Sequence, residues 1–148
     1  MGDKVRCADM IVRATTTYAI QIMIAIAKSE GVISSSAISE QTGISQIYLK
    51  KVATCLKKAK LIHSRQGLCG GYSLIHPPEQ ITMLEILRSV EPEEATGTIS
   101  KTEGQINESD SSILVQQMFS DINNKLKNYF EAVTLADLIE KPEGHDTE

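Results

Sequence analysis

The stretch QTGIS, residues 41–45, constrains the fold of this chain more than any other feature. It lies between a short segment of helical pattern over about residues 37–42, preceded by serines that can cap it, and a longer helical segment that Ser45 can cap. Gly43 stands where the chain must reverse, and Ile44 can fill the core behind the turn. The pattern therefore predicts two helices joined by a tight turn.

A further helix is expected before this pair. It is predicted over about residues 13–29, where apolar residues recur every three or four positions. The helix after the turn should extend from Ser45 to about Lys60. Its predicted buried stripe consists of Leu49, Val52 and Leu56.

A β-hairpin is predicted after these helices. Leu61 and Ile62 begin a strand, QGLCGG (residues 66–71) forms the turn, and GYSLI (residues 71–75) returns as the second strand. The order helix, helix, turn, helix, hairpin is typical of a winged helix-turn-helix, in which the helix after the turn recognises DNA.

The last third of the chain predicts helices again. Thr82 and Glu85 have the spacing of a capping box, so a helix is expected over residues 83–90. A long amphipathic helix is expected over about residues 111–133, and Thr134 can cap a short final helix. The expected fold class is mainly α with a small β-hairpin, a winged helix-turn-helix with a long C-terminal helix.

The length of 148 residues suits one domain with extensions. We expect an N-terminal extension over 1–9, a winged helix-turn-helix over 10–90, a flexible loop over 91–109, dimerisation helices over 110–140 and a tail over 141–148. Three cysteines without disulfide-framework spacing favour a reducing compartment, and the longest apolar run is too short to span a membrane. A cytoplasmic protein without a membrane partner is expected.

Charge is distributed unevenly along the chain. The formal net charge is −4, which by itself argues weakly against a nucleic-acid partner. Residues 41–76 nevertheless contain no acidic side chain and six basic ones: Lys50, Lys51, Lys57, Lys58, Lys60 and Arg65. A basic block of this kind within an acidic chain indicates a surface that binds a polyanion.

The helix from Ser45 has an informative outer face. At 100° per residue Ile47 points away from the buried stripe, and Gln46, Lys50 and Lys51 lie on the same outward half. An outward Ile near a helix start is suited to thymine methyl groups, Gln46 to adenine edges, and the two lysines to phosphate or guanine. The alternative is a solvated lysine-rich helix with one stray Ile.

The adjoining stretch HSRQGLCGGY (residues 63–72) favours the DNA interpretation, with double-stranded DNA as the partner. Arg65 and Gln66 lie at the tip or shoulder of the predicted wing, and its glycines permit a close approach to a DNA backbone. Neither a dinucleotide-binding nor a P-loop spacing is present.

The patterns GISxxYL and RxGxxGGYxLxxPPExIT identify a resemblance over about residues 10–91. The chain resembles the Rrf-two family of bacterial regulators, of the IscR/NsrR/CymR type. The resemblance implies a homodimeric winged-helix DNA binder, usually a repressor, in which the long C-terminal helix forms the dimer. By position it implies DNA contacts at the following residues: Ser45, Gln46, Tyr48, Lys50, Lys51 and, on the wing, Arg65, Gln66 and Gly67.

Two consequences follow from this resemblance. A palindromic operator would match a two-fold dimer, for which the long helix offers Met118, Ile122, Leu126 and Tyr129. Cluster-binding members of the family have cysteines before that helix, whereas residues 91–109 contain neither Cys nor His. We therefore expect no cofactor and no metal. A small-molecule effector or a regulatory protein partner could act between the long helix and the winged-helix body, or at the loop over 91–109.

Two other functions compete with DNA binding as interpretations of this sequence. Cys69 with His63 has no orienting third group, so an enzyme is not expected. The basic face could instead bind an acidic protein, which would make the winged helix a protein-interaction module. Binding that follows DNA sequence would separate this alternative from a regulator.

Cys69 is also a candidate redox-sensitive thiol, because the neighbouring positive charge of Arg65 favours the thiolate. The alternative is an inert cysteine on the wing. If Cys69 is redox-active at the DNA surface, alkylating it with iodoacetamide should weaken DNA binding, measured by fluorescence anisotropy. The variant Cys69→Ser should be insensitive to the reagent. An unchanged affinity after complete alkylation would exclude this hypothesis.

Overall fold

The computed structural model of this chain describes residues 14–91 and 109–140. The expected extension over 1–9, the tail over 141–148 and nearly all of the expected loop over 91–109 lie outside the described residues. The proposed division into domains therefore stays a prediction.

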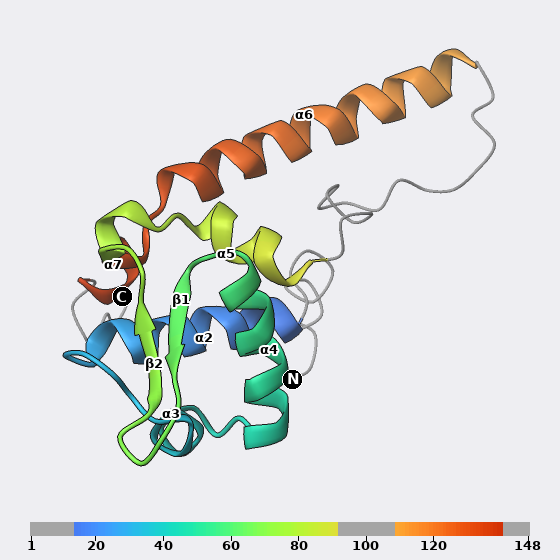
Figure 1. The fold of residues 1–148 in the computed structure, drawn as a ribbon. Helices are drawn as coiled ribbons and strands as arrows, with labels where there is room; N and C mark the ends of the chain where they lie inside the picture. The colour runs from blue at the N-terminus through green and yellow to red at the C-terminus, as the bar shows by residue number, and fades with distance from the viewer. Residues whose placement is uncertain (1–13, 92–108, 141–148) are drawn as a thin grey trace, which may run out of the picture.

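The described residues are mainly α-helical with one two-stranded antiparallel hairpin, which confirms the predicted fold class (Figure 1). Residues 83–90 form a helix as predicted, and the other long helices match their predicted bounds to within about two residues at each end. The elements are α2 (Ala14–Lys28), α3 (Ser35–Thr42), α4 (Gln46–Lys58), β1 (Ile62–Arg65), β2 (Gly71–Leu74), η1 (Pro78–Gln80), α5 (Met83–Val90), α6 (Asp110–Ala132) and α7 (Leu135–Ile139).

The start of α3 corrects one prediction. The helix begins at Ser35 rather than near Ala37, because Ser34 is the N-cap and its side chain accepts a hydrogen bond from the Ala37 backbone N–H at 3.1 Å. Ser36, inside the first turn, instead accepts a hydrogen bond from the Gln46 side chain at 3.2 Å. Consecutive serines leave the choice of cap open in the sequence, and the direction of the incoming chain decides it.

The core lies between α2, α4 and α5. Ile22 of α2 and Ile86 of α5 are fully buried, and the predicted stripe of α4 is buried as expected. The capping box at Thr82 is confirmed, with the Thr82 side chain and Glu85 satisfying each other's backbone N–H groups. These contacts fix α4 with one face inward and its opposite face outward.

The hairpin is held against the segment before α3. The strands pair antiparallel from Ile62 with Leu74 to Arg65 with Gly71. Ile33 pairs in turn with Tyr72 through two backbone hydrogen bonds of 3.0 and 2.8 Å. A side chain at Gly71 would overlap the Ile33 carbonyl. The wing therefore has a fixed position relative to α3.

The C-terminal helices differ in their packing. Chain segments around α7 pair with the body, since the Met83 N–H donates to the Val133 carbonyl and the Leu135 N–H to the Ile81 carbonyl. Leu135 is fully buried. By contrast, α6 projects beyond the body over most of its length and has no buried residue (Figure 1). None of the described helices is long and apolar enough to cross a membrane.

The close approach of Gly71 to Ile33 predicts a specific loss of stability. Gly71→Ala should lower the free energy of unfolding by about 2 kcal/mol more than the control Gly31→Ala, because the added methyl must displace backbone. Both glycines have positive φ, but a methyl at Gly31 would meet nothing within 4 Å. Urea titrations of the two variants would check this, and equal losses would contradict the steric argument.

Candidate nucleic-acid interface

The turn between α3 and α4 presents the start of α4 to solvent. Gly43 has φ +76°, the left-handed conformation that ends α3, and its N–H donates to the Ser39 carbonyl at 2.8 Å. Ser45 then caps α4, accepting from the Tyr48 N–H at 3.3 Å. Ile44 between them is buried, as its expected role in the core requires. The helix therefore begins at a firmly anchored point.

The outward orientation predicted for α4 is confirmed. Ile47 is 85% exposed, an unusual value for an isoleucine in an ordered helix. Gln46, Lys50 and Lys51 are exposed on the same side, while Leu49 is fully buried. An apolar side chain is thus held in water among polar and cationic neighbours, an arrangement suited to a major-groove surface.

Two expected contact residues also have structural partners. The Gln46 amide donates to the Ser36 hydroxyl at 3.2 Å, which ties α4 to α3. The Tyr48 hydroxyl lies 3.0 Å from the Thr15 hydroxyl, and its ring packs edge-to-face on Tyr18 with centroids 5.2 Å apart. These contacts leave Tyr48 half-buried. Its hydroxyl and that of Thr15 form a pair of neighbouring polar groups at the start of α2.

A groove of about 500 Å³ separates α4 from the wing. Its lining combines three cations with hydroxyl groups, and none of the described lining residues is acidic. The polar lining residues are Ser34, Ser35, Lys50, Thr54, Lys57, Ser64, Arg65, Gln66 and Tyr72. Such a surface attracts an extended anion along its length.

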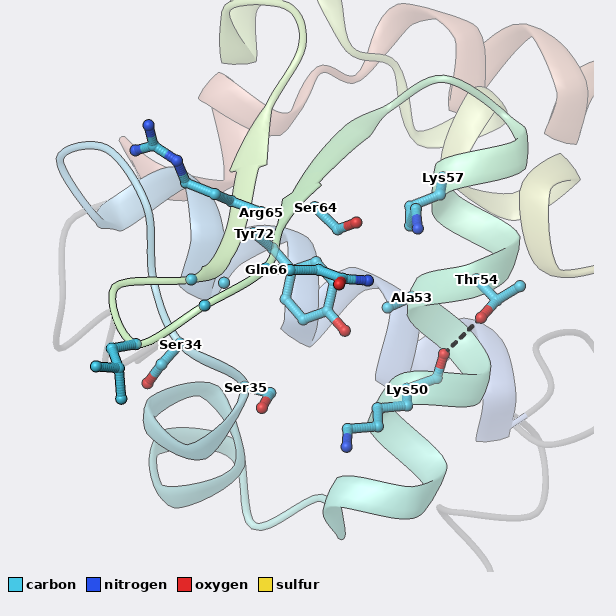
Figure 2. A pocket seen from close by; sticks show the side chains of 14 residues that line it. Ser34, Ser35, Lys50, Ala53, Thr54, Lys57, Ser64, Arg65, Gln66 and Tyr72 are labelled. Carbon is cyan, nitrogen blue, oxygen red and sulfur yellow. Dashed lines mark hydrogen bonds between the residues drawn. The ribbon is translucent and has the colours of Figure 1, made fainter.

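The side chains in the groove have different directions (Figure 2). Lys50 and Lys57 extend from α4 toward the wing, and the Gln66 side chain points from the wing toward α4. Arg65 points away from α4, so it reaches a region beyond the groove. Burial raises the pKa of Tyr72 above its usual value of 10.0. Its hydroxyl is protonated at neutral pH with or without this shift, and it can donate a hydrogen bond.

The remaining wing residues lie at its end. Gly67 and Leu68 border the groove, whereas Cys69 is exposed but does not line it. Cys55 is half-buried on α4. No cluster of three or more potential metal ligands occurs among residues 14–91 and 109–140.

Several groove residues were not singled out from the sequence. Lys57 belongs to the basic block, and its spacing of seven from Lys50 places both lysines on one helix face. Ser34 and Ser35 belong to the start of α3, and their place beside the wing depends on the pairing of Ile33 with Tyr72. That pairing carries no local signal in the sequence.

The predicted dimer residues lie on α6. Met118 is 49% and Tyr129 63% exposed, Ile122 is also exposed, and Leu126 is half-buried. Ile113, Leu114 and Val115, which are not among the predicted dimer residues, add exposed apolar surface near the start of the helix. A helix that presents this much apolar surface to water is typical of an interface.

The order of elements, the outward face of α4 and the anchored hairpin define a winged helix-turn-helix protein. The chain belongs to the Rrf2 family, whose model, described as an iron-dependent transcriptional regulator, matches residues 12–141. Among curated relatives, the HTH-type transcriptional regulator CymR of Bacillus subtilis is 31% identical over 129 residues, which are 86% of this chain and 88% of that protein.

Solved structures show the same arrangement. The structure of CymR, described as the global cysteine regulator of B. subtilis, has a TM-score of 0.73 and 27% identity, covering 89% of this chain and 98% of that one. IscR of T. potens has a TM-score of 0.71 and 25% identity, covering 93% of this chain and 91% of that one. The relatives are DNA-binding transcriptional regulators, and this chain is a DNA-binding transcriptional regulator of the same family.

Proposed function

We propose that the protein is a homodimeric repressor that binds a palindromic operator and works without an iron–sulfur cluster. The groove between α4 and the wing is the observation that carries the DNA-binding part of this proposal, because cations and hydroxyls line it without an acidic side chain. It lies beside the exposed face of α4, so one DNA duplex can meet both surfaces.

In this proposal α4 enters a major groove. Ile47 contacts thymine methyl groups, and Gln46 turns from Ser36 to an adenine edge. Lys50 and Lys51 bind phosphate or guanine, while Ser45 and Tyr48 hold the start of α4 against the DNA backbone. The hydrogen bonds that Ser45 and Tyr48 make within the protein keep their side chains in place before DNA binds, which lowers the entropic cost of binding.

The wing would contact the DNA strand that passes between it and α4, from the side opposite α4. Its backbone at Gly67 can approach the DNA closely, and Gln66 faces the groove. Arg65 points away from α4, as a side chain that reaches the next minor groove would. A DNA sugar–phosphate backbone passing between α4 and the wing would meet Lys57 and the Tyr72 hydroxyl.

A second copy of the chain would cover α6. Met118, Ile122 and Tyr129 form an apolar stripe at spacings of four and seven residues. Leu126 lies within this stripe, between Ile122 and Tyr129. The helix that carries the stripe, α6, lies on the side of the molecule opposite α3 and the end of the wing (Figure 1). Pairing through α6 would therefore leave both DNA-contacting surfaces open, and two-fold symmetry would match a palindrome.

The proposal that no cluster is bound rests on the donors that the sequence offers before α6. The segment between α5 and α6 contains no Cys and no His, and a two-iron cluster needs four such ligands. The two cysteines in the described residues lie on α4 and on the wing rather than near α6. Regulation would then come from a small molecule or a protein acting where α6 meets the body.

The lysines of the groove predict a steep salt dependence of DNA binding. Affinity for duplex DNA should fall by three orders of magnitude or more between 50 and 200 mM salt if a dimer makes at least about six phosphate contacts. Lys57→Gln should reduce the slope of log K against log salt by about one for each lysine removed. Fluorescence anisotropy titrations at several salt concentrations measure both quantities.

The matched control is Lys127→Gln, which removes an exposed lysine from α6, remote from the groove. It should leave the slope unchanged. Equal slopes for wild type and Lys57→Gln would contradict the role of the groove. Weak DNA binding together with binding to acidic proteins would support the interaction-module alternative.

The apolar stripe predicts the oligomeric state. At micromolar concentration the wild type should sediment at twice the chain mass of 16.2 kDa. Ile122→Asp should sediment as a monomer, because a dimer would bury an unpaired carboxylate. Asn124→Asp places the same charge on another face of α6 and should stay dimeric. A monomeric wild type in analytical ultracentrifugation would refute the proposed dimer.

A further inference from the structure

Leu68 stands at the end of the wing with its whole side chain in water. Its exposed area is 108% of the reference value, the largest among the described hydrophobic residues that are exposed. Single exposed leucines are common on protein surfaces. Leu68 differs from them because the turn that holds it is tightly fixed.

The turn that carries Leu68 is closed by a backbone hydrogen bond. The Gly70 N–H donates to the Gly67 carbonyl at 3.0 Å, which makes residues 67–70 a β-turn with Leu68 and Cys69 at its two central positions. A side chain at Gly70 would collide with the Arg65 carbonyl, so the chain packs closely there. The pairing of Tyr72 with Ile33 then fixes the base of the hairpin. Leu68 is therefore presented at a defined point.

The surroundings of Leu68 are suited to nucleic acid. Leu68 lines the end of the groove that also contains Lys50, Lys57 and Arg65. Arg65 precedes it on the wing by three residues and points away from α4. Duplex DNA bound along this groove would bring sugars and base edges to the end of the hairpin, where an apolar side chain can displace water.

We propose that Leu68 inserts into the minor groove beside the strand held between α4 and the wing. There it would contact sugars and base edges and favour a flexible pyrimidine–purine step, where partial unstacking costs least. This inference rests on the proposed DNA-binding function. It assigns to Leu68 an apolar contribution to affinity and site preference, separate from the contribution of the cations.

The test compares Leu68→Ala and Leu68→Met on duplexes that the wild type has enriched from a random pool. Leu68→Ala should bind about tenfold more weakly, whereas Leu68→Met, which keeps a similar apolar volume, should bind within about twofold of the wild type. Because no charge is removed, the slope of log K against log salt should not change for either variant. Unchanged thermal unfolding of both variants excludes a loss of folded protein.

A second readout locates the insertion. The fluorescent base 2-aminopurine, placed at the step nearest the wing, should brighten on binding of the wild type and of Leu68→Met but not of Leu68→Ala. Equal affinities of all three proteins, or equal brightening, would overturn the proposal for Leu68 while the DNA-binding function stands. If the wild type enriches no duplex, the proposed function itself fails.

Discussion

The backbone pairing of Ile33 with Tyr72 is the contact on which the binding surface depends. Two hydrogen bonds and the close approach of Gly71 join the hairpin to the segment before α3. Since α3 leads through Gly43 into α4, this contact sets the position of the wing relative to α4. The shape of the groove between them is therefore set by backbone geometry, and the cationic side chains that line it determine its charge.

Charge and apolar surface are divided between the two ends of the molecule. The basic stretch supplies α4 and the wing, while most acidic residues lie in the later part of the chain. Helix α6, which carries exposed apolar residues, projects from the opposite side of the body (Figure 1). A net negative charge therefore does not prevent DNA binding, because a polyanion responds to the local field of the surface it meets. The same division would allow DNA and the proposed second copy to bind without competing.

Local rules predicted most of the fold, and long-range pairing explains the rest. The caps at Ser45 and Thr82 and the outward direction of Ile47 follow from spacing alone. The choice of Ser34 as a cap does not, because three consecutive serines can each serve. The groove residues Ser34 and Tyr72 come together only through pairing across nearly forty residues. The residues expected to contact DNA remain predictions, since their role depends on a partner outside the chain.

Selection from random duplex DNA tests the central claim most directly. The purified protein and the variant with Lys50→Glu and Lys51→Glu would each be taken through repeated rounds of binding and sequencing. The account predicts that the wild type enriches a palindrome with two half-sites about one helical turn apart, and that the variant enriches none. Enrichment of the same palindrome by both proteins, or of no sequence by the wild type, would contradict recognition through the exposed face of α4.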